Sequence, residues 1–145
     1  MISDTERSIS ERKVALVTGG GSRVGRAVAE GLMGLGMEVV ITTSDRDKMA
    51  AAAFFGEENV YKMDLRDIDE IGSTFASVLD RFGGVDVLVN SAGVYETSCV
   101  TDLTEEKWDR IMAINVKGCA FLIKEMAREG RGGGVINIAD VWGQK

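Results

Sequence analysis

The sequence predicts an α/β fold in which a five-stranded parallel sheet, with strand order 3-2-1-4-5, is covered by helices on both faces. Short apolar segments alternate along the chain with longer segments of helical period, which is typical of repeated strand–helix units. The apolar segments are nearly continuous, as expected for strands buried on both faces. The first of them leads directly into a glycine cluster. Because strand–helix–strand crossovers are right-handed, these units predict a doubly wound sheet.

The elements of the first half follow from their boundary residues. The first strand is expected at Val14–Thr18, and the next helix begins at Arg23 and ends near Gly36, where a left-handed backbone is often needed. The following predicted elements are a strand at Glu38–Thr43, a short helix at residues 47–55 and a strand at residues 59–63.

In the second half, helix boundaries are marked by capping residues. Asp67 can cap a helix that Gly83 stops, and Thr104 can cap a long helix that runs to about residue 128. Asn115 lies in the middle of that long helix and favours a local kink. The two remaining predicted strands are residues 86–90 and 135–139.

Length and composition bound the class of protein. At 145 residues the chain has the length of one domain, with residues 1–13 expected to be a flexible leader and residues 14–145 to form the fold. The net charge is −6 and no segment is strongly basic, so no nucleic-acid partner is expected. No apolar run approaches the roughly 20 residues that span a bilayer, so no membrane partner is expected either. The chain has no histidine, and Cys99 and Cys119 are far apart, so no metal site is expected and the thiols favour a cytoplasmic location.

Ligands of doubly wound sheets bind beyond the carboxyl ends of the strands. Here the segment TGGGSRVG (residues 18–25) follows the first strand and opens a helix, so its backbone N–H groups and the helix dipole favour an anion such as a pyrophosphate. The alternative is an ordinary glycine turn. The candidate cofactor-binding residues in this segment are Thr18, Gly19, Ser22, Arg23, Val24 and Gly25.

This segment resembles the TGxxxGxG fingerprint of the short-chain dehydrogenase/reductase family, whose members have a Rossmann-type fold. Arg23 stands where the fingerprint has its middle glycine. The TGxxxRxG form is similar to that of pteridine reductases and their NADPH-dependent relatives, and this resemblance implies that Arg23 helps to hold the phosphates of the cofactor.

The end of the second strand indicates which dinucleotide is expected. A carboxylate there would hydrogen-bond the adenosine ribose of NAD and repel the extra phosphate of NADP. In the resembled family that position falls on Thr43, and Thr43 and Ser44 offer hydroxyls, with Arg46 within reach of a phosphate. NADP(H) is therefore the expected cofactor. Asp45 is an acid nearby, and a solvated polar turn is the alternative.

Two further segments resemble family motifs of the adenosine site. Asp64, followed by Leu65, ends the third strand where the family places an acid against the adenine amino group; the alternative is that Asp64 caps the next helix. The segment NSAG resembles the NNAG signature, which implies that it shapes the floor of the cofactor site, although a structural turn is the alternative. Its residues are Asn90, Ser91, Ala92 and Gly93.

Two residues are expected near the chemistry. Asn115 follows Asn90 by twenty-five residues, and the resemblance implies that it holds a water of the proton relay through its main chain; an exposed helical asparagine is the alternative. Asp140 stands where the family usually has a serine that orients the substrate carbonyl. The resemblance to pteridine reductases implies that Asp140 hydrogen-bonds the substrate and assists proton delivery, whereas an aspartate alone at a strand end is usually a turn former.

The family's Tyr-x-x-x-Lys pair, the expected proton donor and its partner, is absent. It would begin about thirteen residues after Asp140, and neither Tyr61 nor Tyr95 has a lysine four residues later. The chain is thus expected to be the N-terminal, cofactor-binding part of a longer enzyme, with its fifth strand an uncovered edge and its stability marginal.

The expected parent is an NADPH-dependent, homo-oligomeric (dimeric or tetrameric) reductase. It would transfer hydride to a C=O or C=N of a small substrate, such as a pteridine or folate-like ring. The alternatives are a nucleotide-binding module or truncated pseudoenzyme without turnover, and a regulatory domain of the same fold.

Overall fold

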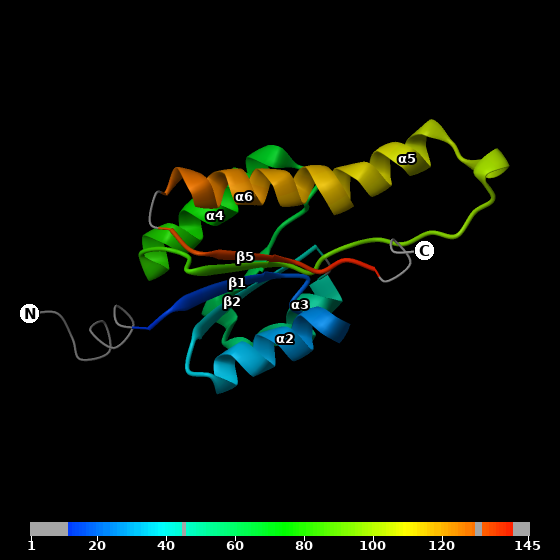
Figure 1. Ribbon diagram of the computed structural model, residues 1–145. Helices are drawn as coiled ribbons and strands as arrows, with labels where there is room; N and C mark the ends of the chain where they lie inside the picture. Colours follow the sequence, from blue (N-terminus) through cyan, green and yellow to red (C-terminus); the bar gives the residue numbers. More distant parts are fainter. Residues whose placement is uncertain (1–11, 45, 130–131, 141–145) are drawn as a thin grey trace, which may run out of the picture.

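The computed structural model describes residues 12–44, 46–129 and 132–140 and contains one parallel sheet with strand order β3-β2-β1-β4-β5, as predicted (Figure 1). All four neighbouring strand pairs are parallel. The strands are β1 (Val14–Thr18), β2 (Glu38–Thr43), β3 (Val60–Lys62), β4 (Val87–Asn90) and β5 (Gly134–Asn137).

Helices cover both faces of this sheet, which gives three layers (Figure 1). Helices α2 (Arg23–Gly34) and α3 (Arg46–Ala52) lie on one face. Helices α4 (Ile68–Phe82), α5 (Glu105–Met112) and α6 (Cys119–Arg128) lie on the other. The predicted doubly wound, Rossmann-type arrangement is confirmed.

Strand β1 is the centre of the fold, and all five of its residues are buried. Successive side chains of a strand point to opposite faces of the sheet. Val14 and Leu16 therefore pack in the core beneath α4 and α6, where Phe75 and Leu122 are also buried. Their neighbours on β1 pack in the second core, beneath α2, with residues such as Ala29. The continuous apolar sequence of β1 is explained by burial against both helical layers.

Capping residues set the ends of α4 as predicted. The Asp67 side chain accepts hydrogen bonds from the backbone N–H groups of Asp69 and Glu70 at 3.0 and 3.1 Å. At the other end Gly83 has a φ of 75°, the left-handed conformation that closes a helix with little steric cost. Thr104 likewise accepts a hydrogen bond from the backbone N–H of Lys107, which fixes the start of α5.

The long helix differs from the prediction in the form of its interruption. Residues Ala113–Gly118 form a π-helical segment between α5 and α6, so the helix continues but is locally wider. Gly118 packs directly against the loop after β3: an added Cβ would lie 2.7 Å from Leu65 Cβ and 2.8 Å from Leu65 O. The wide turn places Asn115 and Gly118 in contact with two different loops.

The bounds of β1 and β2 match the predicted ranges, whereas those of β3, β4 and β5 differ from them by one or two residues. The strand predicted at β3 began at Asn59, which instead ends a short 3-10 helix, Glu57–Asn59. The Asn59 amide donates to Glu38 Oε1 at 2.6 Å and to Val39 O at 3.2 Å, so its side chain takes part in joining this segment to β2. The predicted short helix starts at Arg46, one residue early, and ends in a 3-10 turn, Ala53–Phe55.

Strand β5 forms one edge of the sheet, and its residues are exposed, as expected. Val135 and Ile136 retain 40% and 48% of their accessible surface.

At the start of the fold, the Lys13 ammonium lies 2.9 Å from the carboxylate of Asp86, which ties the last residue of the predicted leader to the loop before β4. Residues 1–11 lie outside the described residues. Within the described ranges, no helix is both long and apolar enough to cross a membrane.

Candidate functional site

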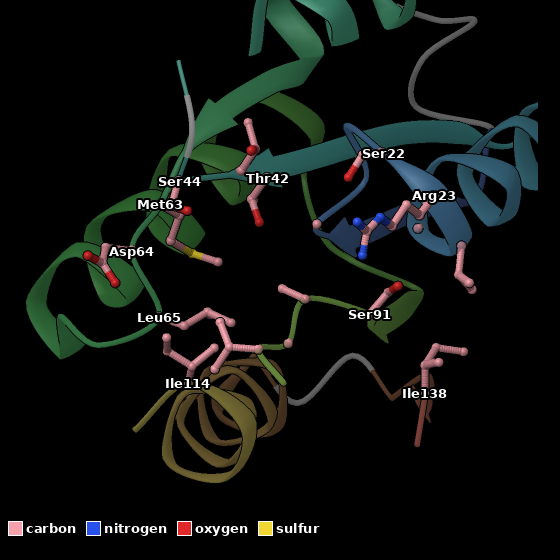
Figure 2. A pocket seen from close by; sticks show the side chains of 17 residues that line it. Ser22, Arg23, Thr42, Ser44, Met63, Asp64, Leu65, Ser91, Ile114 and Ile138 are labelled. Carbon is pink, nitrogen blue, oxygen red and sulfur yellow. The ribbon is translucent and has the colours of Figure 1, made fainter. Parts of the chain in front are cut away.

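A cavity of about 440 Å³ lies at the carboxyl ends of the central strands, where ligands of doubly wound sheets bind (Figure 2). It is lined by Gly19, Ser22, Arg23, Val24, Gly25, Thr42, Thr43, Ser44, Met63, Asp64, Leu65, Ser91, Ala92, Gly93, Val94, Ile114 and Ile138. Of the predicted cofactor-binding residues whose side chains the structure describes, all are in this set except Thr18 and Asn90.

The glycine turn after β1 brings main chain to the cavity wall with no side chain between. Gly19 has a φ of +65°, and a Cβ there would lie 2.9 Å from Ala92 Cα. A Cβ on Gly25 would lie 2.4 Å from the carbonyl oxygen of Gly19. Only glycine fits at either position, and the close packing keeps the start of α2 against the end of β1.

The start of α2 has unused capacity for an anion. Its N-cap residue, Ser22, makes no side-chain capping bond, and the first turn holds no acidic residue. The first N–H groups of a helix lack partners within the helix, and the dipole adds a partial positive charge there. This end of α2 is therefore suited to a phosphate group.

Arg23 adds a full positive charge beside that helix end. Figure 2 shows its side chain on the side of the cavity where Ser22 and Ser91 also lie. Among the residues that the structure describes, no carboxylate forms an ion pair with Arg23. Its backbone has a φ of 49°, a left-handed conformation that costs a side-chain-bearing residue energy. An unpaired arginine held in this conformation at the cavity is a candidate phosphate ligand.

Thr18 occupies a different position from its predicted neighbours. It is fully buried and does not line the cavity. Its hydroxyl oxygen accepts hydrogen bonds from the backbone N–H groups of Ser91 and Ala92, both at 3.1 Å. Thr18 therefore joins the end of β1 to the loop after β4 and shapes the cavity from behind.

We expect Thr18→Val, which keeps the shape but removes the acceptor, to lower the free energy of unfolding by about 2 kcal/mol because two backbone donors lose their partner. Thr18→Ser retains the oxygen and serves as the control. Urea denaturation of both variants measures the difference, and equal stability of Thr18→Val and the parent chain would contradict this role.

The end of β2 presents hydroxyl groups to the cavity. Thr42, Thr43 and Ser44 line it, and none of them carries a charge. Asp45 lies outside the described residues, and so does the side chain of Arg46, whose backbone begins α3. The described wall at this strand end therefore lacks a carboxylate.

Asp64 lies at the opposite side of the cavity from the glycine turn, beside Met63 (Figure 2). Its carboxylate is bound by the guanidinium of Arg66, with Oδ2 2.6 Å from one terminal nitrogen and Oδ1 3.0 Å from Nε. The side-chain hydrogen bond from Arg66 holds the pKa of Asp64 below its usual value, despite the opposing effect of partial burial. The capping role considered as the alternative for Asp64 belongs to Asp67.

The NSAG segment divides between the cavity and the sheet. Ser91, Ala92 and Gly93 line the cavity, whereas Asn90 is only 2% exposed and does not. The Asn90 amide nitrogen donates to Asn137 Oδ1 at 2.8 Å, which joins β4 to β5. Among the described residues its own carbonyl oxygen, Oδ1, has no hydrogen-bond partner.

Asn115 does not itself line the cavity but holds a residue that does. Its Oδ1 accepts from the backbone N–H of Val94 at 2.9 Å, and its Nδ2 donates to the carbonyl of Val94 at 2.8 Å. A second contact supports the same loop, since Glu96 forms an ion pair with Arg110 of α5. The loop after β4 is therefore attached to the long helix at two points.

Asp140 is exposed and is the last residue of the described range 132–140. It does not line the cavity, although Ile138, two residues earlier, does.

Five lining residues were not among the sequence-based candidates: Thr42, Met63, Val94, Ile114 and Ile138. Each lies within two residues of a candidate at a strand end or on the long helix, so proximity in sequence was the only available signal.

Metal binding has no support within the described part of the chain, where His, Cys, Asp and Glu form no group of three or more that could hold an ion.

Comparison with known proteins places this fold and site in a family. The sequence profile described as short chain dehydrogenase matches residues 13–145, and the chain belongs to this family. It is 34% identical to galactitol 2-dehydrogenase of Agrobacterium fabrum and 36% identical to a sorbitol dehydrogenase of Cereibacter sphaeroides, over 139 residues that cover 92% of this chain and 54% of each relative. The chain thus spans about half the length of these curated relatives, which are named for sugar alcohols and not for pteridines.

Solved structures agree with the family assignment. A short-chain dehydrogenase from Streptomyces avermitilis superposes with a TM-score of 0.82 at 32% identity, covering 93% of this chain and 52% of that one. A metagenomic short-chain oxidoreductase, solved in complex with NADP, superposes with a TM-score of 0.83 at 31% identity, covering 95% of this chain and 66% of that one.

Proposed function

We propose that this chain binds NADP(H) and forms the cofactor-binding part of an oxidoreductase that transfers hydride between the nicotinamide and a C=O or C=N group of a small substrate. The observation that carries the proposal is the arrangement around the cavity. A helix start without a side-chain cap and an arginine without an ion-pair partner among the described residues lie at one strand end, and uncharged hydroxyls lie at the next. The structural relative solved with NADP supports the choice of cofactor.

The residues present fit such a dinucleotide. The absence of Cβ atoms at Gly19 and Gly25 lets the turn pack tightly against Ala92 and on itself, which places its main chain in the cavity wall. A diphosphate can approach this main chain, and Arg23 supplies a positive charge beside it. Thr43 and Ser44 leave room for the additional phosphate of NADP, because the described wall holds no carboxylate there to repel it. We also propose that Arg46 contributes a charge to that phosphate.

The remaining lining residues are proposed to hold the adenosine. Asp64 accepts a hydrogen bond from the adenine amino group, while Leu65 and Ala92 offer apolar surface and Gly93 forms part of the wall. Leu65 and Ile114 line the same cavity, where apolar side chains exclude water from the bound cofactor.

When bound, NADPH would supply the hydride. Two residues outside the cavity wall are proposed to take part in the chemistry. Asn115 fixes the loop at Val94 and is proposed to hold a water molecule through its main chain. Asp140 is proposed to hydrogen-bond the substrate and to assist proton delivery to the atom next to the one that receives hydride.

Two substrate classes have specific support. Arg23 and Asp140 both depart from the common family pattern, and their occurrence in the same sequence supports a pteridine or folate-like ring. The relatives named for galactitol and sorbitol support a sugar alcohol, oxidised to the corresponding ketose with NADP+. In either case hydride moves between the nicotinamide and a substrate carbon, and one proton moves to or from the neighbouring nitrogen or oxygen.

Titration with NADPH and NADH, followed by fluorescence of the reduced nicotinamide, tests the proposal. We expect NADPH to bind at least about tenfold more tightly than NADH, since an additional phosphate contact of about 1.4 kcal/mol corresponds to that ratio. Equal affinities would contradict the choice of NADP, and no binding of either would contradict the proposal itself.

Turnover is measured next, with a dihydropteridine and NADPH and with galactitol or sorbitol and NADP+. Binding of NADPH without any oxidation would favour the alternative of a nucleotide-binding module. Turnover of one class of substrate would identify that class.

A further inference from the structure

Asp64, which lines the cavity, forms an ion pair with Arg66. Four hydrogen bonds join the two residues: Asp64 Oδ1 accepts from the backbone N–H of Arg66 at 2.9 Å and from Nε at 3.0 Å, and Oδ2 accepts from Nε at 3.1 Å and from a terminal nitrogen at 2.6 Å. Both oxygens of the carboxylate are therefore held by one arginine.

This geometry fixes the orientation of the carboxylate. A side-chain carboxylate on a loop can rotate about two bonds, and a single hydrogen bond would leave much of that freedom. A guanidinium fork that contacts both oxygens, together with a backbone N–H, restrains the plane of the group as well as its position. Asp64 remains 26% exposed at its side chain and lines the cavity, so part of the restrained carboxylate is still accessible to a ligand.

Arg66 itself has a different environment. It is not among the residues that line the cavity, and its side chain is 57% exposed. Among the described residues its only ion-pair partner is Asp64. Contact between Arg66 and a ligand in the cavity is therefore not indicated, and any effect of Arg66 on binding has to act through Asp64.

We propose that Arg66 is a positioning residue for purine recognition: it holds the Asp64 carboxylate in the one orientation that accepts a hydrogen bond from the exocyclic amino group of the cofactor's adenine. This inference rests on the proposed function, because it takes the ligand to be a dinucleotide whose adenosine lies beside β3. It adds a residue that sets the selectivity for the purine without touching it.

The deamino analogue of NADPH separates this role from general binding. In nicotinamide hypoxanthine dinucleotide phosphate an oxygen replaces the amino group, so the ligand offers an acceptor where Asp64 needs a donor. We expect the parent chain to bind NADPH about tenfold more tightly than the analogue, the size of one charge-assisted hydrogen bond. Arg66→Ala is expected to reduce that ratio to about twofold, because Asp64 then samples other orientations.

Three further variants define the cause. Arg66→Lys keeps the positive charge but cannot form the fork, so a ratio close to that of Arg66→Ala assigns the effect to geometry. Asp64→Asn alone should abolish the preference for NADPH over the hypoxanthine analogue. The double variant with Arg66→Ala should then show the same affinity ratio as Asp64→Asn, since the arginine acts through the aspartate. Arg81→Ala, which removes an arginine from the last turn of α4, is the matched control and should keep the ratio of the parent chain.

The ratio of two affinities on one protein is unaffected by a loss of stability alone, so partial unfolding of a variant cannot imitate the expected result. Retention of the tenfold ratio in Arg66→Ala would overturn the inference, as would a parent chain that binds both dinucleotides equally. Failure of the parent chain to bind either dinucleotide would overturn the proposed function and this inference with it.

Discussion

Gly25→Ala is expected to abolish measurable NADPH binding and to lower the free energy of unfolding by about 1–3 kcal/mol, the range for overpacking a close contact. The new Cβ would lie 2.4 Å from the carbonyl oxygen of Gly19 and 2.8 Å from its carbonyl carbon. These are backbone atoms, which cannot rotate away as a flexible side chain could. The glycine turn would have to shift, and with it the N–H groups proposed to receive the diphosphate.

The same helix provides a matched control for this substitution. Gly31 also lies in α2, but a Cβ there would meet no atom within 4 Å. Gly31→Ala is therefore expected to raise the free energy of unfolding by about 0.5–1 kcal/mol through helix propensity, with unchanged NADPH affinity. Chemical denaturation and NADPH titration of both variants test the pair. Full NADPH affinity in Gly25→Ala would contradict the proposed place of the diphosphate.

Arg23→Gly is expected to weaken NADPH binding by about 10- to 100-fold without destabilising the fold. Hydrogen bonds to charged groups contribute about 1.5–3 kcal/mol, which corresponds to roughly that loss of affinity. Glycine adopts positive φ values freely, so the left-handed backbone at this position, with φ 49°, is retained and its steric cost is relieved. We therefore expect the free energy of unfolding to stay constant or to rise by up to about 1 kcal/mol.

Weaker NADPH binding together with undiminished stability would identify Arg23 as a ligand-binding residue. As the salt concentration rises, the NADPH affinity of the parent chain should fall more steeply than that of Arg23→Gly, because the variant lacks one positive charge at the site. Arg128→Ala, which removes a charge from the last turn of α6, controls for net charge and should bind NADPH as the parent chain does. NADPH affinity that is unchanged in Arg23→Gly would show that this arginine does not contact the phosphates.

The sequence identified the topology because its signals are local. Continuous apolar segments, helical periodicity and capping residues such as Asp67 are each complete within a few turns of chain. A glycine pattern between a strand and a helix similarly predicts a main chain that approaches a ligand closely. Most residues of the segment 18–25 do line the cavity. The ends of β1 and β2 were predicted correctly, but those of β3, β4 and β5 were not, as at Asn59, because pairing with a neighbouring strand sets where a strand begins and stops.

The contacts of individual side chains could not be predicted in the same way. Thr18 belongs to a pattern associated with cofactors, yet its hydroxyl binds the backbone of Ser91 and Ala92, more than seventy residues away. Asn115 was expected to kink a helix, and the structure shows a π-helical turn in which its amide holds Val94. Both contacts join segments that are distant in sequence, so nothing near either residue indicates its partner.

Hydrophobic periodicity and glycine spacing are properties of local sequence, and they are enough to predict a doubly wound parallel sheet with a glycine-rich anion site after its first strand. The packing of the folded chain, in contrast, sets which residues reach the cavity and which support it from behind. It placed Met63 and Ile138 in the wall and Thr18 and Asn90 behind it. The physical reason is that a side chain's role depends on the neighbours it meets when distant strands are brought side by side, and those neighbours are set by the packing of the whole sheet.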